Sequence, residues 1–284
     1  MKYVAILLTC YNRVNTTLKA LEKIFNASIP VGYELSIYLV DDASPDNTGE
    51  ITKDKYPKIT VINGNGDLYW NGGMRLAWET AAKIKDYDFY IWMNDDTFLY
   101  EQSLVNLFTD YGKINKMSIL TAACHEPNSD IFSYGGRTEK GPIIPNYNNP
   151  QECKYINGNL VLIPKHIYKE VGNLSSAYTH CLGDFDYGLR VIKNGYFCYT
   201  TSKYIAECKL NLVSDYINPE FNLIKRIRSY FKSKDINLKE MIHYTIKHKG
   251  YLAVIKLILS IHFRIIFPKY FFKLKKIESE FINK

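Results

Sequence analysis

The first hundred residues carry two kinds of hydrophobic pattern. Short, nearly continuous apolar runs, typical of strands that are buried on both faces of a parallel sheet, span residues 4–8, 36–40, 59–62 and 88–93. The apolar residues after the first run recur at helical spacing, at Val14, Leu18, Leu21 and Phe25. A further helix is predicted from Met74. This alternation of strand and helix predicts an α/β fold with a mostly parallel central sheet.

Three of the predicted strands end in clusters of polar residues. These clusters are Thr9-Cys10-Tyr11-Asn12-Arg13, Asp41-Asp42 and Asn94-Asp95-Asp96. In open α/β sheets, ligands bind beyond the carboxyl ends of the strands. The clusters therefore predict a binding site at that edge of the sheet.

Common phosphate-binding motifs do not occur in the sequence. The turn after the first strand has no glycine, which excludes the G-x-G-x-x-G fingerprint, and no P-loop pattern is present. Ala43 stands where a D-x-D phosphatase needs its second aspartate. Because carboxylates repel phosphates, acidic strand ends can hold a nucleotide diphosphate only through a divalent cation, Mg²⁺ or Mn²⁺. Side chains alternate along an extended segment, so Asp96 is the best candidate for the metal ligand, with Asn94 or Asp95 touching water or ribose.

The composition is that of a folded, globular protein, with 46% hydrophobic and 23% charged residues. An aromatic share of 14% favours a surface that binds rings such as sugars or bases. The six cysteines form no C-x-x-C pair, so we expect reduced thiols in a cytosol rather than a zinc ribbon or a disulfide scaffold. The N-terminal apolar run is too short for a signal peptide and is predicted to be a strand.

Positive charge is concentrated towards the end of the chain. Residues 221–284 carry 15 Lys and Arg against 4 Asp and Glu, a net charge of +11, which leaves −4 for residues 1–220 out of a total of +7. A mildly acidic body with a basic tail is unlike a duplex-DNA binder, and no nucleic-acid partner is expected. Lys256 and Arg264 interrupt the apolar run 251–267, which disfavours a spanning helix. An amphipathic helix in the interface of an anionic membrane is the preferred interpretation, and a helical subdomain packed on the body is the alternative.

Four motifs together resemble family 2 glycosyltransferases of the GT-A fold. They are Thr9-Cys10-Tyr11-Asn12-Arg13, the run from Val40 to Thr48, Asn94-Asp95-Asp96, and the run from Gly183 to Arg190. Their order and spacing match over residues 1–215, so we expect a GT-A domain there and a basic, helical C-terminal region over residues 216–284. The glycine-rich stretch from Asp67 to Arg75 is similar to bacterial members that build surface polysaccharides, among them rhamnosyltransferase-like proteins.

The resemblance implies transfer of a sugar from a nucleotide diphosphate sugar with inversion, assisted by Mg²⁺ or Mn²⁺. It places Thr9 and Tyr11 in the base pocket, and it makes Asp42 the acceptor for a pyrimidine N–H, which suits UDP and dTDP equally. It puts Asp96 on the metal. The positions that match nucleotide-binding residues are Thr9, Tyr11, Asn12, Arg13, Asp42, Gly73, Arg75, Asn94 and Asp95.

Asp184 matches the aspartate that usually serves as catalytic base in this family. A helix is predicted to start at Gly183, and residues two apart on a helix diverge, so Asp184 and Asp186 cannot both face one acceptor hydroxyl. The helix N-terminus is expected to lower the pKa of Asp184 and keep it ionised. Asp186 is expected to orient the acceptor or to pair with Arg190, and Arg190 is assigned to acceptor orientation with it.

The sequence departs from the family pattern at three points. Asn94 stands where the family has the first Asp of its D-x-D motif, and Gly183 rather than Glu precedes Asp184. Many members carry a histidine after the strand that follows the Asp184 motif, and residues 204–209 of this chain contain none. Glu207 or Cys208 is expected to substitute for it, or the metal has fewer protein ligands.

The preferred interpretation is an enzyme of surface polysaccharide biosynthesis that glycosylates a hydroxyl of a glycan or lipid-linked acceptor. It is expected in the cytoplasm, peripheral on the inner face of the cell membrane. A homodimer is possible, but the sequence does not define the oligomeric state. A sugar-1-phosphate nucleotidyltransferase shares the alternating sheet but normally opens with a turn rich in glycine and lysine that this chain lacks. A non-catalytic nucleotide-sugar-binding or scaffold protein would keep the pocket without turnover, and an assay of nucleoside diphosphate release distinguishes it.

Overall fold

The structure is a computed structural model that describes residues 1–210, 214–232 and 237–271. It divides into two compact units. The N-terminal unit comprises Met1–Thr179 and Gly183–Leu210, and the C-terminal unit comprises His180–Leu182 and the described residues after 210. The division falls close to the shift in composition that marks the basic end of the sequence.

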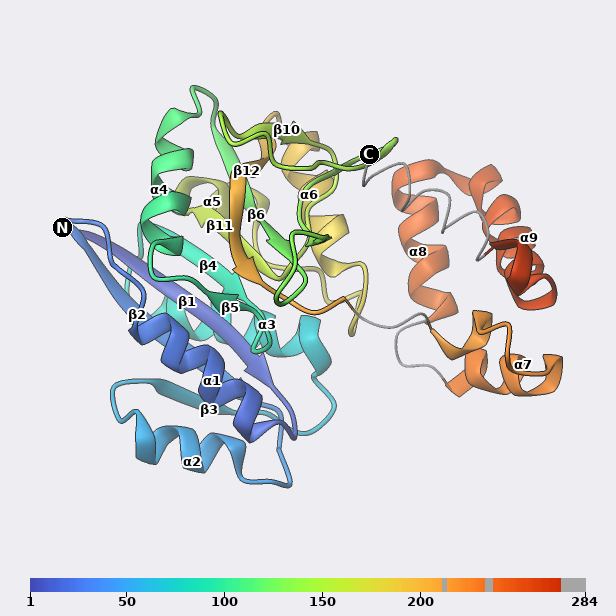
Figure 1. The fold of residues 1–284 in the computed structure, drawn as a ribbon, viewed down its shortest axis with the longest axis horizontal. Helices are drawn as coiled ribbons and strands as arrows, with labels where there is room; N and C mark the ends of the chain where they lie inside the picture. The colour runs from blue at the N-terminus through green and yellow to red at the C-terminus, as the bar shows by residue number, and fades with distance from the viewer. Residues whose placement is uncertain (211–213, 233–236, 272–284) are drawn as a thin grey trace. The chain divides into compact units, whose positions relative to one another are not determined.

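A mixed sheet forms the centre of the N-terminal unit (Figure 1). Its strands are β1 Lys2–Cys10, β2 Tyr33–Asp41, β3 Thr60–Asn63, β4 Phe89–Met93, β5 Phe98–Leu99, β6 Ser118–His125, β7 Phe132–Tyr134, β10 Gln151–Cys153, β11 Leu160–Pro164 and β12 Phe197–Glu207. The main path runs β10-β12-β6-β11-β4-β1-β2-β3, and β8 Arg137–Thr138 pairs separately with β9 Gly141–Pro142. The mostly parallel sheet is confirmed, since β4, β1, β2 and β3 are parallel throughout. The antiparallel strand β11, between β4 and β6, was not predicted.

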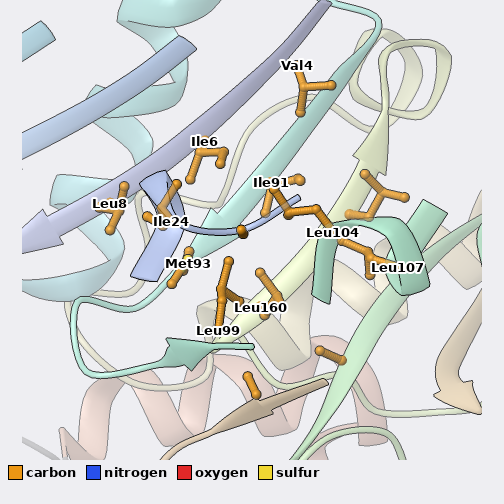
Figure 2. Packing of buried hydrophobic residues seen from close by; sticks show 14 of the residues in the cluster. Val4, Ile6, Leu8, Ile24, Ile91, Met93, Leu99, Leu104, Leu107 and Leu160 are labelled. Atoms are coloured by element: carbon orange, nitrogen blue, oxygen red, sulfur yellow. The ribbon is translucent and has the colours of Figure 1, made fainter. Parts of the chain in front are cut away.

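Helices cover both faces of this sheet. They are α1 Val14–Phe25, α2 Thr48–Lys55, α3 Tyr69–Ile84, α4 Ser103–Lys113, α5 Lys165–Val171 and α6 Gly183–Lys193. Buried residues of α1 and α4 pack on one face with Val4, Ile6 and Leu8 of β1 (Figure 2). Buried residues of α3, α5 and α6 pack on the other face with Ala5 and Leu7. Because β1 is covered on both sides, its apolar run is continuous rather than alternating.

The four strands predicted in the first hundred residues are confirmed as β1 to β4, and the helix at Val14 is confirmed as α1. Helix α3 begins at Tyr69, earlier than the predicted start at Met74. The carboxylate of Asp42 accepts the backbone N–H groups of Leu68 and Tyr69, at 2.9 and 3.0 Å. The first N–H groups of a helix have no acceptor within the helix, and here the carboxylate of Asp42 is their acceptor. Most of the glycine-rich stretch, from Tyr69 to Arg75, therefore belongs to α3.

The C-terminal unit is helical in its described part. It contains the 3-10 turn η1 Asp215–Ile217 and the helices α7 Leu223–Lys232, α8 Leu238–Lys249 and α9 Tyr251–Ile266. Its small core is formed by Tyr230, Ile261 and Ile265. The predicted helical C-terminal region is thus confirmed. Among the described helices, none combines the length and the apolar character needed to cross a bilayer.

Candidate functional site

Asp42, which follows β2, fixes the glycine-rich loop before α3. Its carboxylate accepts N–H hydrogen bonds from Gly66 at 2.8 Å, Leu68 at 2.9 Å and Tyr69 at 3.0 Å, and the residue is buried. Its negative charge lies at the N-terminus of α3, where the helix dipole stabilises an anion. Asp42 therefore joins the loop to the end of β2. Its contact with a pyrimidine base stays a prediction.

The turn after β1 is tied to the turn after β2. The N–H of Asn12 donates to Ser44 Oγ at 3.0 Å, and the Ser44 hydroxyl donates to Asp41 Oδ1. Asp41 Oδ2 accepts the N–H of Gly49, in α2, at 3.0 Å. The side chain of Tyr11, in the same turn as Asn12, is 52% exposed. An aromatic ring held on a fixed turn and open to solvent can stack on a base.

Helix α3 approaches the end of β1 closely because residue 73 is glycine. A Cβ atom at Gly73 would lie 2.1 Å from Oγ1 of Thr9, so any larger residue would push the helix off the strand. Thr9 and Gly73, both predicted nucleotide-binding residues, are therefore neighbours. Arg75, on the same helix, ion-pairs with Glu79 at 3.4 Å. That pair is partly exposed and contributes little to stability.

Arg13 joins the two carboxylates that follow β4. Its Nη1 lies 3.1 Å from Asp95 Oδ1 and 3.0 Å from Asp96 Oδ2. Asp95 is buried and also accepts a hydrogen bond from Thr17 Oγ1 at 3.0 Å. Burial raises the pKa of Asp95 to about 7, and the charge of Arg13 opposes that rise. The side chain of Asp96 keeps 38% of its surface exposed, so Asp96 is the carboxylate that a ligand from solvent can reach.

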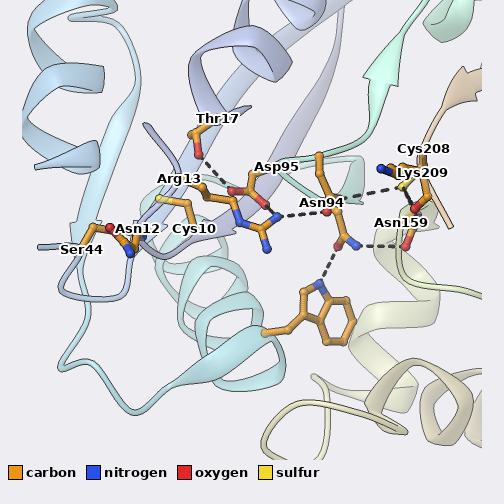
Figure 3. Close-up of polar contacts among 12 residues, drawn as sticks. Cys10, Asn12, Arg13, Thr17, Ser44, Asn94, Asp95, Asn159, Cys208 and Lys209 are labelled. Carbon is orange, nitrogen blue, oxygen red and sulfur yellow. Dashed lines mark hydrogen bonds and ion pairs between the residues drawn. The ribbon is translucent and has the colours of Figure 1, made fainter. Parts of the chain in front are cut away.

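Asn94 holds together side chains from separate parts of the chain (Figure 3). Its Oδ1 accepts the indole N–H of Trp70 at 2.6 Å, and its Nδ2 donates to Asn159 Oδ1 at 2.9 Å. Asn159 Nδ2 lies 2.9 Å from Cys208 Sγ, which is 3.9 Å from Asp96 Oδ1. Because an indole N–H can only donate, it fixes the orientation of both amides. We call these five side chains the Asn94 network.

The donor set at Asp96 fits Mg²⁺ or Mn²⁺ held mainly by substrate and water. Within the part of the chain that the structure describes, no three His, Cys, Asp or Glu side chains form a metal-binding group. Mg²⁺ is commonly held by one or two carboxylates together with substrate phosphates and water. Of the two predicted substitutes for the missing histidine, Cys208 lies beside Asp96, whereas Glu207 lies near Tyr100. Burial raises the pKa of Cys208 to about 12, so its thiol is neutral at pH 7.

Asp184 lies in the first turn of α6 and contacts the segment before β11. Its Oδ2 accepts the N–H of Gly158 at 2.9 Å, and its Oδ1 accepts the N–H of Phe185 at 2.8 Å. Burial raises the pKa of Asp184 to about 6, against the lowering effect of these bonds. The N–H groups at the N-terminus of α6 lower this pKa as expected, but desolvation outweighs them, so the net shift is upward. At pH 7 the carboxylate is still mostly ionised and can accept a proton.

Trp70 lies against the residue that Asp184 also contacts. A Cβ atom at Gly158 would be 2.5 Å from Cζ2 of Trp70 and 3.5 Å from Cβ of Asp184, so the ring and the carboxylate both adjoin Gly158. The ring of Trp70 is half-buried and packs edge-to-face on Trp92, with centroids 6.2 Å apart. The predicted base Asp184 therefore adjoins the Asn94 network through Gly158, and the predicted metal ligand Asp96 belongs to that network.

Asp186 and Arg190 form a buried ion pair. Arg190 Nε donates to Asp186 Oδ2 at 2.9 Å, and Tyr178 Oη donates to Asp186 Oδ1 at 3.2 Å. The other guanidinium nitrogens donate to the carbonyls of Val171 and Asn173. The predicted pairing is confirmed, and so is the divergence of Asp186 from Asp184. The side chain of Asp186 is fully buried, and its role in orienting an acceptor stays a prediction.

Sequence reasoning did not assign Asn71, which is completely buried in α3. Its Nδ2 donates to the carbonyls of Ser175 at 2.9 Å and Tyr178 at 2.7 Å, and its backbone N–H donates to Thr179 at 3.0 Å. These bonds hold the segment that leads into α6 and its Asp184. The signal in the sequence is an amide among apolar positions of one helix. It shows that the residue needs partners but not which ones.

We expect Asn94→Asp to reduce transfer about tenfold, although it restores the acidic residue of the family motif. An aspartate can accept from Trp70 but cannot donate to Asn159, and a lost buried hydrogen bond costs about 1–3 kcal/mol. Iodide quenching of tryptophan fluorescence measures the effect on Trp70, because Trp78 and Trp92 are fully buried. Repulsion between the new carboxylate and Asn159 Oδ1 should displace residue 94 and, with it, the ring of Trp70, so quenching should rise in the variant. Higher activity with unchanged quenching would instead mean that residue 94 acts as a metal ligand.

The fold and the acidic strand ends agree with the expected GT-A class of protein. The family model described as Glycosyl transferase family 2 matches residues 5–161, more than half of the chain. The chain therefore belongs to glycosyl transferase family 2 and is a glycosyltransferase. The match covers the ends of β1, β2 and β4 but stops before Asp184. No curated protein matches the chain in a sequence comparison.

Several solved glycosyltransferases of the GT-A class share the fold. S. aureus TarS, residues 1–349, matches with a TM-score of 0.57 at 12% identity, over 94% of this chain and 81% of that chain. The mannosyltransferase PcManGT from Pyrobaculum calidifontis, in complex with GDP-Man and Mn²⁺, matches with a TM-score of 0.54 at 14% identity, over 88% and 71%. GalNAc-T7 with UDP, GalNAc and Mn²⁺ matches with a TM-score of 0.58 at 13% identity, over 81% and 48%. At these identities the likeness shows the fold alone.

Proposed function

We propose that this enzyme transfers a sugar, with inversion, from a UDP- or dTDP-sugar to a hydroxyl group of a glycan or lipid-linked acceptor. The observation that supports the proposal is that Asp96 belongs to the Asn94 network and Asp184 adjoins the same network through Gly158. Inverting transfer needs a base on the acceptor side and compensation of negative charge on the leaving diphosphate. The two carboxylates differ in burial, which supports a division of these two tasks between them.

In this proposal Asp184 accepts the proton of the acceptor hydroxyl as the bond between the sugar and the diphosphate breaks. A pKa of about 6 suits a base that works near neutral pH. Asp96 would hold Mg²⁺ or Mn²⁺, which would supply Lewis-acid stabilisation of the departing oxygens. Arg13 adds a positive charge at the same edge. The use of a metal is supported by PcManGT and GalNAc-T7, both of which were solved with Mn²⁺.

The nucleotide is proposed to bind over the turns after β1 and β2. The exposed ring of Tyr11 offers a stacking surface. Asp42 is assigned to the pyrimidine N–H by the family resemblance, although its buried carboxylate already accepts three backbone N–H groups. The remaining residues assigned to the nucleotide are Thr9, Asn12, Arg13, Gly73, Arg75, Asn94 and Asp95. The TarS structure in complex with UDP-GlcNAc supports a uridine nucleotide on this fold.

Calorimetry with UDP and with dTDP, each with and without Mn²⁺, tests donor recognition. Release of UDP or dTDP from UDP-glucose, UDP-galactose, UDP-GlcNAc and dTDP-glucose then tests turnover. We expect binding of at least one of the two nucleotides, stronger with Mn²⁺. Binding of neither nucleotide under any condition would remove the proposed function.

We also propose that the C-terminal unit places the enzyme on the inner face of the cell membrane, where surface polysaccharides are assembled on lipid carriers. Apolar side chains at helical spacing are exposed along α7 and α9, namely Ile224, Ile227, Phe231, Leu252, Ile255, Leu259, Phe263 and Ile266. The exposed cations Lys225 and Arg228 accompany them on α7. A basic helix with an exposed apolar face binds the interface of anionic membranes.

The double substitution Leu252→Ser and Leu259→Ser should weaken binding to vesicles that contain phosphatidylglycerol about tenfold. The two side chains are 82% and 64% exposed, so the change removes apolar area from the proposed membrane face without opening the core. Co-sedimentation with vesicles measures the loss. Val31→Ser, at a fully exposed position of the N-terminal unit, is the control. Unchanged vesicle binding in the double variant would contradict the membrane proposal.

A further inference from the structure

The C-terminal unit contains a cavity of about 510 Å³ that lies outside the candidate site. Its lining residues are Pro219, Arg226, Ile266, Phe267, Pro268, Lys269 and Tyr270. Two of them are cations, none is acidic, and the rest are apolar or aromatic. Such a lining complements a ligand that carries both a negative charge and a hydrocarbon part.

Arg226 is the residue that points to an anion. Only 8% of its surface is exposed. Its Nη1 donates to the carbonyl of Phe221 at 2.7 Å, but its Nε is buried and has no hydrogen-bond partner among the described residues. A buried guanidinium with an unmade hydrogen bond is costly, and an anion that reaches it removes that cost. Arg226 lines the cavity, so an anion bound there lies beside this side chain.

Unlike Arg226, the large apolar side chains that line the cavity are exposed to solvent. Ile266 is 50%, Phe267 54% and Tyr270 59% exposed, and Lys269 between them is also exposed. Ile266 also ends the exposed apolar stripe of α9. The cavity is thus continuous with the surface that is proposed to face the membrane. A free inorganic anion would use only the two cations and none of this apolar surface.

We propose that this cavity binds the phosphate group of a membrane lipid, with Arg226 and Lys269 on the phosphate oxygens and the hydrocarbon along Ile266, Phe267 and Tyr270. Guanidinium groups match phosphate geometry through paired N–H donors. The inference rests on the proposed membrane association and adds a specific lipid site to it. A bilayer phospholipid and an isoprenyl phosphate of the kind that carries acceptor sugars share this chemistry.

Calorimetry on the full chain with soluble probes tests the site. The probes are dihexanoyl phosphatidylglycerol, farnesyl phosphate and glycerol 3-phosphate. We expect one or both lipid phosphates to bind at least about tenfold more tightly than glycerol 3-phosphate, because only they use the apolar lining. The tighter of the two lipid probes identifies the phospholipid or the isoprenyl phosphate as the source. Glycerol 3-phosphate binding as tight as that of both lipids would overturn the proposal.

Two matched pairs of variants separate the cavity from general charge attraction. Arg226→Gln should weaken binding of the preferred lipid probe about tenfold. Arg137→Gln, which removes the same charge from an exposed position of the N-terminal unit, should not. Lys269→Gln and the exposed Lys256→Gln form the second pair, which keeps the test valid if thermal unfolding shows that Arg226→Gln folds poorly. If both variants of each pair lose the same affinity for the lipid probe, the proposed cavity site is wrong.

The outcome is independent of the sugar-transfer proposal. Failure of UDP and dTDP to bind would remove the proposed function and leave the lipid titrations unaffected. If Arg226→Gln and Lys269→Gln leave lipid-probe binding unchanged while the Leu252→Ser and Leu259→Ser variant loses vesicle binding, the membrane surface is real and the cavity site is not.

Discussion

Asp184→Asn should lower the rate of sugar transfer about 10³-fold while donor binding stays within about twofold of the original enzyme. An amide cannot accept the proton of the acceptor hydroxyl, and general-base catalysis contributes about 10²–10⁴-fold. Asp184 contacts the backbone of Gly158 and Phe185 and none of the predicted nucleotide-binding side chains. Release of UDP or dTDP measures the rate, and calorimetry with the nucleotide measures binding.

The control for this substitution is Asp54→Asn, at an exposed position of α2. It makes the same chemical change away from the site and should leave the rate unaltered. The amide that replaces the Asp184 carboxylate has one acceptor oxygen and can keep only one of the two backbone N–H bonds, so thermal unfolding of the variant has to be compared with the original. A folded Asp184→Asn enzyme with near-normal turnover would show that the base is a different residue.

The pH profile gives a second readout of the same residue. Burial raises the pKa of Asp184 to about 6, so the carboxylate is protonated below that pH and cannot act as a base. The rate should therefore fall about tenfold per pH unit below about 6 and level off above it. Asp95, whose pKa burial raises to about 7, titrates nearby. Donor binding by Asp184→Asn across the same pH range isolates the contribution of Asp95.

The sequence was sufficient for the first strands of the sheet because their burial pattern is local. A run such as Val4 to Leu8 can be buried on both faces only within a covered sheet, and the polar residues after it then lie at the carboxyl edge. The order of the elements thereby placed Asp42 and Asp96 at one edge. Strand β11 was not predicted in this way. Its short apolar run, Leu160 to Pro164, gives no information on whether it pairs parallel or antiparallel.

The contacts within the site could not be predicted, because they join residues that are far apart in the sequence. Trp70, Asn94, Asn159 and Cys208 form one network only after α3, β11 and β12 have packed. Asn94 was interpreted from its own position as a nucleotide-binding residue that replaces the first Asp of the D-x-D motif. Its structural partners show another reason for an amide there, which is that it must donate and accept at once. A pKa such as that of Asp184 likewise depends on burial, which no motif specifies.

Asp96→Ala should abolish the effect of Mn²⁺ on donor binding and lower the rate of transfer about 100-fold or more. Asp96 is the accessible carboxylate of the predicted metal site, and Lewis-acid stabilisation of a leaving diphosphate is worth several kcal/mol, at about 1.4 kcal/mol per factor of ten. Calorimetric titration of UDP, or of dTDP if that nucleotide binds, with Mn²⁺ and with a chelator measures the first effect. Asp54→Ala is the matched control.

Without metal, the same substitution should act in the opposite direction. The carboxylate of Asp96 repels a diphosphate, and the guanidinium of Arg13 forms ion pairs with both Asp96 and Asp95. Removing Asp96 relieves that repulsion and leaves Arg13 with a single partner, so the variant should bind the nucleotide at least as tightly as the original enzyme when a chelator is present. With Mn²⁺ the order should reverse. Equal affinities under both conditions would mean that Asp96 neither holds a cation nor faces the diphosphate, and Asp95 or Cys208 would then have to be tested in its place.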